Sequence, residues 1–510
     1  MQTQPKHDEM FENIECASGE KAGDIEETVS IIQERERKNT LSRAISRKLD
    51  IHLMPLLCVL FVLSYLDRGN IGNAKTAGAQ ADLGLSSVQW SWVLLSFYIT
   101  YTCFEWLVLC WKIFPAHIYV SCLCIGWGAA AMCSGAVHNL GGMIATRVLV
   151  GFFEAGFGAG VPYFMSMAYK RSELGVRLAV LLGTSPIANC IAGAMAYGIS
   201  HIKSDIESWR WILIIGQYSL APKQRSKLTL TTEGIPTVLI APVVYFYLMD
   251  NVATAKFLTE DERTFAVERL QTIDTTAKSK LSKVQIWAGI SDYKSYCHAL
   301  IHFCCNYSFA CLSNFLPTIV QGLGYTSIRA QGLTAPPYLG AFICCVFAAF
   351  ASNKFGQRGP MTAAFATLGA IGYGLLASQK DTNVRYAAIW FASCGVFPAL
   401  ALNMTWMLNN QAGDTKKGTV MSVLAIFGQC SSFVASTIFP VEDKPYYVKG
   451  TAVGCGLTGL IVPISLFLHF KLKAENKRRD ALSATANAPE GHQIDVTALG
   501  DAHQGFRYFT

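Results

Sequence analysis

Charged residues are scarce in this chain of 510 residues. Lys, Arg, Asp and Glu together make up 15% of it, whereas apolar residues make up 52%. Soluble domains have about a quarter of their residues charged, so this composition indicates a protein that crosses a membrane several times. The net charge of +7 does not indicate nucleic-acid binding. The cations lie in tails and in short loops between apolar runs, where they orient helices in a bilayer.

Motifs of soluble catalysis and cofactor binding do not occur in the sequence. It has no dinucleotide-binding or P-loop fingerprint, so ATP coupling has no support, and no nucleophile–base pair indicates an enzyme. The 17 cysteines lie almost all in apolar runs without metal-ligand spacing. We expect them to be small buried hydrophobes, and we expect no metal and no other cofactor. The first forty residues are polar, which indicates no signal peptide and a disordered tail.

Twelve apolar runs are long enough to cross a bilayer as helices. Six precede a polar stretch at residues 250–295, and six follow it. The runs lie near residues 51–68, 88–109, 118–137, 142–168, 177–199, 233–249, 298–320, 333–351, 361–378, 384–408, 418–439 and 450–470. An even number of spans puts both ends of the chain on one side. The Lys and Arg residues that flank the first and last runs indicate the cytoplasmic side.

Twelve spans arranged as six plus six are typical of the major facilitator superfamily. The sequence therefore predicts an all-α polytopic membrane protein with two pseudo-symmetric halves, a substrate site between them near the middle of the membrane, and access that alternates by rocking. The expected segments are a disordered cytoplasmic tail at 1–48, an N-terminal half at 49–249, a cytoplasmic linker at 250–295, a C-terminal half at 296–471 and a cytoplasmic tail at 472–510.

The segment from Arg147 to Arg177 is the most informative part of the chain. It begins as an apolar run that nevertheless contains Arg147 and Glu154. Seven helical residues make two turns, so these two side chains and Gly151 share one face, with the charges about 10 Å apart along the axis. Ionised groups at membrane depth are expensive unless they face a polar interior, which makes them candidate functional residues. A proton-carrying role for Glu154 and a static structural pair both fit.

Six stretches follow one another in a specific order. They are DRGNIGNA (67–74), RVLVGFFEAG (147–156) with YKRSE (169–173), FLPTIVQGLGY (315–325), QGLTAPPY (331–338), WMLNNQAG (406–413) and EDKPYY (442–447). Together they resemble the fungal anion:cation symporter family, the allantoate, nicotinate and pantothenate permease group of the major facilitator superfamily.

This resemblance implies proton-driven uptake of a small organic anion through the plasma membrane by a monomer. Arg68 and Asn70 match the family's Arg-x-Asn, in which the Arg is associated with the substrate carboxylate, and a guanidinium suits that role. The alternative is that Asp67 and Arg68 pair and merely anchor the first span. The candidate substrate-binding residues are Arg68, Asn70, Arg147, Asn409 and Asn410. The candidate proton-coupling residues are Glu154, Asp67 and Glu105.

Other polar residues within the spans leave alternatives open. Glu105 is either a second protonatable site or a structural contact. His298 and His302 share a face of the seventh span with Asn306, which fits a hydrogen-bonded packing face better than a metal site.

An exporter that exchanges an acidic metabolite for protons remains the second functional hypothesis. A nutrient receptor that transports nothing is the third.

Two departures from the family pattern bear on function. Asn353 stands where the loop after the eighth span usually carries Asp, which predicts weaker closure of the inward gate. In addition, residues 216–232 interrupt the sixth span with three cations and a proline. Without them, residues 209–215 and 233–249 would join into one span of 24 residues. We interpret the insert as a retained intron in the gene model; if it is real, the span begins near Glu233.

Overall fold

The computed structural model describes most of the chain. The described residues are 22–76, 78–199, 235–271, 281–438, 443, 446–485, 501, 503 and 505–510. The insert at 216–232 lies outside them, as do Trp209–Gly234 as a whole. Within the described part the regular elements are all helical.

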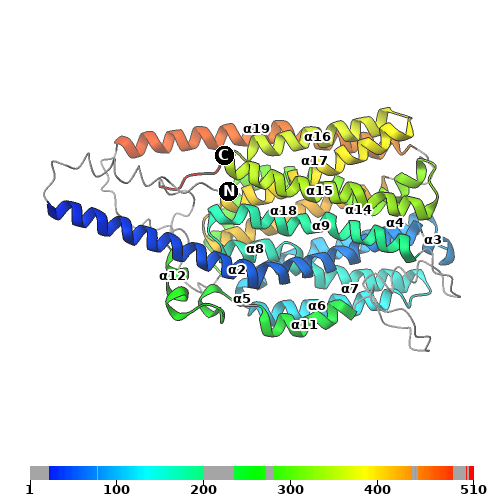
Figure 1. Ribbon diagram of the computed structural model, residues 1–510. Coiled ribbons are helices and arrows are strands. Elements are labelled where there is room, and N and C mark those ends of the chain that lie inside the picture. Colours follow the sequence, from blue (N-terminus) through cyan, green and yellow to red (C-terminus); the bar gives the residue numbers. More distant parts are fainter. Residues whose placement is uncertain are drawn as a thin grey trace.

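The N-terminal half is a group of roughly parallel helices (Figure 1). The first span is the second part of one long helix, and the second and fourth spans each consist of more than one helical piece. The elements are α2 (Ala22–Thr76), α3 (Ala79–Asp82), α4 (Ser87–Phe104), η1 (Glu105–Leu109), α5 (Cys110–Ile113), α6 (Ala116–Ser134), α7 (Leu140–Gly158), α8 (Gly160–Ala168), α9 (Arg171–Ile199) and α11 (Ile235–Tyr247).

The linker and the C-terminal half follow. The linker contributes η2 (Val252–Thr254), α12 (Glu260–Gln271) and α13 (Lys283–Ser291). The six helices of the C-terminal half are α14 (Tyr293–Gly322), α15 (Ser327–Phe355), α16 (Gly359–Ser378), α17 (Thr382–Asn409), α18 (Asp414–Thr437) and α19 (Val448–Thr485). We call the end of the bundle at which α12 lies, on the left in Figure 1, the linker end.

The spans expected from sequence correspond in order to these helices. Ten described helices are long and apolar enough to cross a membrane, and α14, which bends by 61° between Ser313 and Phe315, makes eleven. The sixth span is represented by α11, whose apolar part is shorter (Pro236–Tyr247). The predicted all-α polytopic architecture is therefore confirmed, and the described helices fit the predicted count of twelve.

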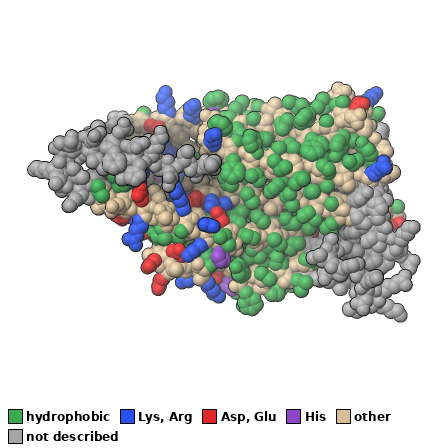
Figure 2. Space-filling view, in the orientation of Figure 1, with side chains coloured by type: hydrophobic (Ala, Val, Ile, Leu, Met, Phe, Trp, Pro, Cys, Tyr) green, Lys and Arg blue, Asp and Glu red, His purple; other side chains and the backbone are tan. Residues whose placement is uncertain are grey.

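The outer surface of the bundle is apolar between two charged ends. Figure 2 shows a broad belt of hydrophobic side chains, with Lys, Arg, Asp and Glu gathered at the linker end and at the opposite rim. Large side chains such as Ile343, Phe347 and Phe246 are more than half exposed there. A soluble protein could not expose such a belt without aggregating, so this surface faces lipid.

The structure differs from the expected disordered tail over residues 22–48, which form the first part of α2. Ile45 on this part and Leu49 directly after it are fully buried. Helix α12 packs on it: Lys48 Nζ lies 2.7 Å from Glu262 Oε1, and Arg269 Nη1 donates to the carbonyl of Ser42 at 3.1 Å. Packing against the linker supplies the stabilisation that a polar segment lacks when it is considered alone.

The two halves touch at both ends of the bundle. Helix α9 packs along α15, α14 along α2, and α18 along α4. One apolar cluster joins Phe61 of α2 to Met404 of α17, and another joins Trp90 of α4 to Phe309 of α14. In this state the central polar residues are enclosed between packed ends.

Candidate functional site

An ion pair joins the first and fourth spans inside the N-terminal half. Arg68 Nε on α2 lies 2.8 Å from Glu154 Oε1 on α7, and the two side chains are 10% and 1% exposed. The Ser64 hydroxyl donates to the same carboxylate oxygen. Glu154 lies 14 residues from each outer end of the α7–α8 span, so the pair sits near the middle of the bundle. A buried carboxylate needs such partners because its desolvation is costly.

Two glycines allow the helices to approach closely enough for this pair. A Cβ on Gly151 would lie 2.7 Å from the carbonyl oxygen of Phe97 on α4. A Cβ on Gly158 would overlap the hydroxyl of Tyr101 and lie 3.5 Å from Arg68 Nη2. The contacts of Gly151 with Phe97 and of Gly158 with Tyr101 leave no room for a larger residue. The glycines of the RVLVGFFEAG stretch and its continuation therefore set the distance between α7 and α4.

Three aromatic rings surround the Arg68 guanidinium. Its Cζ lies 4.5 Å from the ring centroid of Tyr101, 5.1 Å from that of Tyr65 and 5.4 Å from that of Phe97. Aromatic faces attract a cation, and more so where water is excluded. We call these three residues the aromatic cage. It holds the guanidinium in one place while leaving it charged.

The other predicted ionisable residues lie in the same half. Glu105 begins η1, the 3₁₀ segment that interrupts the second span, and its carboxylate is fully buried. Within the described part of the chain neither of its oxygens has a hydrogen-bond partner. It interacts electrostatically with Arg68 and Glu154. Buried Asp67 interacts with Glu154 and with Arg147 in the same way. Two cations and three carboxylates thus share one region.

The partner of Glu154 is not the one that spacing along the helix indicated. Arg147 and Glu154 do share a face of α7, and Arg147 is 6% exposed. The ion pair at 2.8 Å, however, comes from Arg68 on the neighbouring helix. Nor is Arg68 anchored by Asp67, since consecutive residues of a helix point in different directions. Asn70 lies on α2 two residues further on, and its side chain is outside the described part.

Asn409 and Asn410 lie at the linker end, away from Arg68. Asn409 is the last residue of α17 and Asn410 follows it. The Asn409 carbonyl accepts hydrogen bonds from the Arg171 guanidinium at the start of α9, with 2.7 Å from Nε. The Asn409 amide is fully buried, and its Oδ1 and Nδ2 make no hydrogen bond within the described residues. The predicted substrate residues therefore form two groups, one central and one at an end.

Further contacts close the linker end between the halves. Lys112 Nζ donates to Thr415 Oγ1 at 3.0 Å, from the N-terminal to the C-terminal half. Asn353, in the last turn of α15, and Arg358, just before α16, pack against Gly175 of α9, where an added Cβ would lie 2.9 Å from Asn353 Oδ1 and from Arg358 Nη2. The weaker closure expected from Asn353 stays a prediction.

The histidines of the seventh span make packing contacts. His298 Nδ1 lies 2.8 Å from Asn403 Oδ1, and Asn403 Nδ2 donates to the His298 carbonyl at 3.0 Å. Asn306 Nδ2 donates to the carbonyl of Gly428 at 2.8 Å. Within the described residues no group of His, Cys, Asp and Glu has the geometry of a metal site.

Sequence alone did not single out Ser64, Tyr65, Phe97 and Tyr101. A signal was available for two of them, because Ser64 and Tyr65 precede Arg68 by four and three residues and so share its helix face. Phe97 and Tyr101 are likewise four apart on α4. Only the packing of α4 against α2 and α7 brings them to Arg68.

Known proteins resemble this chain along most of its length. Residues 57–222 and 224–436 match the model of the Major Facilitator Superfamily. The high-affinity nicotinic acid transporter of Saccharomyces cerevisiae is 27% identical over 475 residues, which cover 92% of this chain and 85% of that protein. An uncharacterized transporter of Schizosaccharomyces pombe is 31% identical over 471 residues, covering 88% of each. The major facilitator-type transporter hxnP of Emericella nidulans is 29% identical over 475 residues, covering 91% and 92%.

Solved structures share the fold. The proton:xylose symporter XylE superposes with a TM-score of 0.62 at 13% identity, over 81% of this chain and 95% of that one. The human organic anion transporter MFSD10 gives a TM-score of 0.56 at 11% identity, over 82% and 99%. The predicted major facilitator fold is thereby confirmed. From the family model, the relatives and the fold it follows that the chain belongs to the Major Facilitator Superfamily and is a multi-pass membrane transporter, not an enzyme.

Proposed function

We propose that this transporter takes up a small organic anion together with a proton, with Arg68 as the anion anchor and Glu154 as the proton site. The observation that carries the proposal is the buried Arg68–Glu154 pair inside the aromatic cage. It combines a fixed cation, a carboxylate able to change protonation state and flat apolar walls, at the depth where major facilitator transporters bind substrate.

The cage favours a small substrate with one carboxylate. A guanidinium has five N–H donors, and the contact with Glu154 uses its Nε–H. The remaining N–H donors of Arg68 suit the carboxylate of a substrate, because a guanidinium binds a carboxylate in a bidentate manner. The yeast relative is named for nicotinic acid, a flat ring with one carboxylate that the rings of Tyr65, Phe97 and Tyr101 could flank. Pantothenate and allantoate, also implied by the sequence resemblance, are the other candidates.

Competition for Arg68 explains the coupling. While Glu154 is ionised it occupies the guanidinium and needs it as a counter-charge. An entering anion takes over Arg68 and leaves the buried carboxylate without its partner. An unpartnered carboxylate in a low-dielectric site favours its protonated form. Anion binding therefore promotes proton binding at Glu154, and the loaded centre carries no additional net charge across the membrane.

The remaining candidates take secondary roles in this scheme. Glu105 and Asp67 adjust the local charge and offer further places for the proton, and Arg147 balances Asp67. Asn70, two residues after Arg68 in the sequence, stays a candidate substrate contact. Asn409 and Asn410 contact the anion as it leaves at the linker end.

We further infer that the linker end faces the cytoplasm and that the transporter works in the plasma membrane as a monomer. The part of α19 that extends at this end carries Lys471, Lys473, Lys477, Arg478 and Arg479. The first part of α2 carries Arg43, Arg47 and Lys48. Basic residues next to the first and last spans stay on the cytoplasmic side.

Uptake of radiolabelled nicotinate, pantothenate, allantoate and dicarboxylates into permease-deficient yeast tests the proposal. We expect one monocarboxylate or ureido acid to accumulate, faster as the external pH falls, and to stop accumulating when a protonophore is added. Uptake that is indifferent to both treatments would remove proton symport. Efflux of a preloaded acid driven by external protons, without uptake, would favour the exporter hypothesis instead.

A further inference from the structure

The described residues of the segment 501–510 (501, 503 and 505–510) are docked against the linker end of the bundle. Phe506 and Tyr508 are 8% and 7% exposed. They form an apolar cluster with Trp406 of α17 and with Leu468 and Leu472 of α19. A polar tail in solution would bury neither ring. The segment is therefore an integral part of this end of the molecule.

Two lysines hold the start of the segment through Asp501. The Asp501 carboxylate lies 2.6 Å from Lys294 Nζ of α14 and 2.5 Å from Lys416 Nζ of α18. Burial disfavours the ionised carboxylate, but the two ammonium groups outweigh it and keep the pKa of Asp501 below its usual value. Lys294 also donates to the Tyr508 hydroxyl at 2.8 Å. The charges are paired and hydrogen-bonded, as buried charges must be.

Side-chain amides bind the main chain of the segment at two places. Asn410 Nδ2 donates to the Phe509 carbonyl at 2.9 Å, and the Phe509 amide donates back to Asn410 Oδ1 at 2.7 Å. Asn476 of α19 makes the same two-point contact with Tyr508, at 2.8 and 2.9 Å. Trp406 Nε1 donates to the Phe509 carbonyl at 2.8 Å. Contacts of this kind fix the register of the segment.

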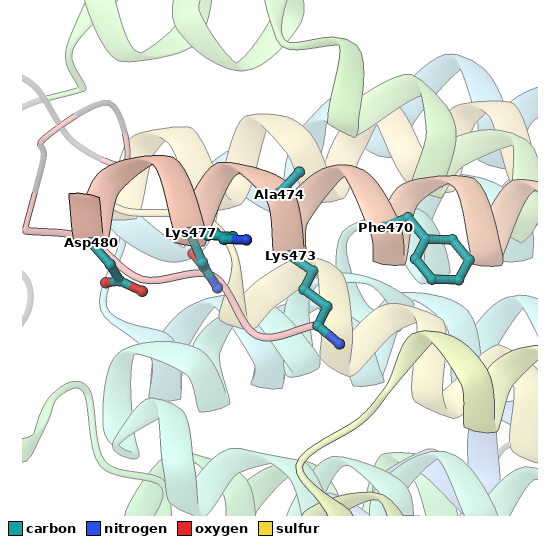
Figure 3. A pocket seen from close by; sticks show the side chains of 6 residues that line it. Phe470, Lys473, Ala474, Lys477 and Asp480 are labelled. Atoms are coloured by element: carbon teal, nitrogen blue, oxygen red, sulfur yellow. The ribbon is translucent and has the colours of Figure 1, made fainter. Parts of the chain in front are cut away.

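Helix α19 provides a platform for the segment beyond the apolar belt. Figure 3 shows this part of the helix, where Phe470, Lys473, Ala474, Lys477 and Asp480 line a shallow, open depression together with Asn476. Arg479 Nη1 donates to the carbonyls of Asp501, His503 and Phe506 at 2.9–3.0 Å. The guanidinium thereby closes the turn of the segment over the helix.

Arg171, among the described residues of the other half, meets the segment. The Arg171 guanidinium of α9 lies 4.2 Å from the Phe506 ring centroid and 5.2 Å from that of Phe509. Its Nη2 also donates to the Arg507 carbonyl at 3.3 Å. This is the same guanidinium that donates to the Asn409 carbonyl between the halves. The segment thus covers the Arg171–Asn409 contact between the halves from the outside.

The distribution of these contacts gives the segment a conformational preference. Its anchoring partners belong to α14, α17, α18 and α19 of the C-terminal half, so the segment moves with that half. Its contact with Arg171 exists only while the halves meet at the linker end. Interactions made in one of two states shift the equilibrium toward that state.

We propose that residues 501–510 form an intramolecular latch that favours the conformation closed at the linker end by enclosing Arg171. The proposal rests on the alternating access of the proposed function, but not on the identity of the substrate. Release of the latch allows the halves to separate at this end and discharge the substrate.

Electron paramagnetic resonance distances between the halves test the latch. Spin-labelled side chains are introduced genetically, because the native cysteines preclude thiol labelling. One pair, at Ile113 and Phe355, reports on the linker end, and the other, at Val88 and Val384, reports on the opposite end; all four positions are exposed. The full chain is compared, without substrate, with a chain that ends at Gly500.

Truncation is expected to lengthen the Ile113–Phe355 distances and to shorten the Val88–Val384 distances. The ratio of open to closed molecules should rise about 5- to 150-fold, the usual range of coupling between two sites. A synthetic peptide with the sequence of residues 501–510, DAHQGFRYFT, should reverse the change when it is added to the truncated protein. Unchanged distances in a folded truncated protein would overturn the proposal, whatever substrate is carried.

Point variants answer the question if the truncated chain does not fold. Phe509→Ala removes one ring from Arg171 and should shift both distance pairs in the same direction as truncation. Arg507→Ala is the matched control, because the Arg507 side chain points to Asp480, at 2.7 Å, while its carbonyl remains for Arg171. Equal changes of the spin-label distances in the two variants would also overturn the proposed latch.

Discussion

Arg68 and Glu154, 86 residues apart in the sequence, form an ion pair across α2 and α7 at 2.8 Å. The guanidinium is enclosed by three aromatic rings, and the carboxylate also accepts a hydrogen bond from Ser64. In the proposed mechanism, an anion that takes over the Arg68 guanidinium deprives Glu154 of its counter-charge. This competition is the physical basis of coupling.

Replacing Arg68 tests the anion anchor. Arg68→Lys keeps the positive charge but loses the planar fork and the stacking on Tyr65 and Tyr101, so it cannot bind a carboxylate in the same way. We expect uptake to fall at least about tenfold, mainly through a raised KM. Initial rates of uptake, normalised to the amount of protein at the cell surface, measure the effect. Near-normal uptake by Arg68→Lys would contradict direct anion binding.

Replacing Glu154 separates exchange from proton-driven accumulation. Glu154→Gln cannot carry a proton, so we expect loss of accumulation and of pH dependence, while exchange of labelled for unlabelled substrate continues. The variant also leaves Arg68 without its counter-charge, which is destabilising. Bound anion should therefore raise the melting temperature of Glu154→Gln more than that of the native protein. Glu105→Gln is the matched control, and an identical loss in it would argue against a special role for Glu154.

The spacing of α4 and α7 depends on Gly151. A Cβ there would lie 2.7 Å from the Phe97 carbonyl, so Gly151→Ala should push the helices apart and cost about 1–3 kcal/mol of stability. A lowered melting temperature of the purified protein checks this. Gly459→Ala on α19 is the control: an added methyl meets no atom within 4 Å there, and the better helix former should be neutral or stabilising. Similar melting temperatures for both variants would contradict the close approach.

Removal of residues 216–232 tests the retained-intron hypothesis. The insert divides the sixth apolar run into residues 209–215 and 233–249, and the 17 residues of the longer piece make about 26 Å of helix, less than the roughly 30 Å of hydrocarbon in a bilayer. We expect the shortened chain to reach the cell surface in greater amount and to be more active. Sequencing of the mature transcript provides the independent check. Transcripts that uniformly contain the insert, with no gain on its removal, would show that the interruption is native.

The latch should be insensitive to mild acid. The pKa of Asp501 lies below the usual 3.8 in the folded protein. The ionised Asp501 therefore contributes its full stabilisation above pH 3.8. This contribution is lost only as the pH falls through the lower pKa that Asp501 has in the folded protein. We expect the Ile113–Phe355 distances to stay constant between about pH 5 and pH 8. Opening within this range would mean that a group other than Asp501 controls the latch.

Sequence could predict the parts of this structure that depend on local composition. Apolar runs indicated the spans, and the Arg, Gly and Glu of the fourth span indicated a functional helix face, since both follow from helical periodicity. The partner of Glu154 could not be predicted, because it depends on how α2 packs against α7. The docking of residues 501–510 was equally hidden: their polar composition indicates a tail, and their buried surface exists only against α17 and α19.

The ionisable groups at the centre come from α2, η1 and α7, which all belong to the N-terminal half. Across the interface, α2 meets the C-terminal half at this level through neutral rings such as Tyr65 and Phe309, whose centroids lie 5.5 Å apart. Rings can slide over one another without exposing an unpaired charge. In the proposed mechanism the charged centre and the sliding contact thus meet at Tyr65, which flanks Arg68 and touches Phe309, so mutation of Phe309 should alter the speed of the cycle without changing its stoichiometry.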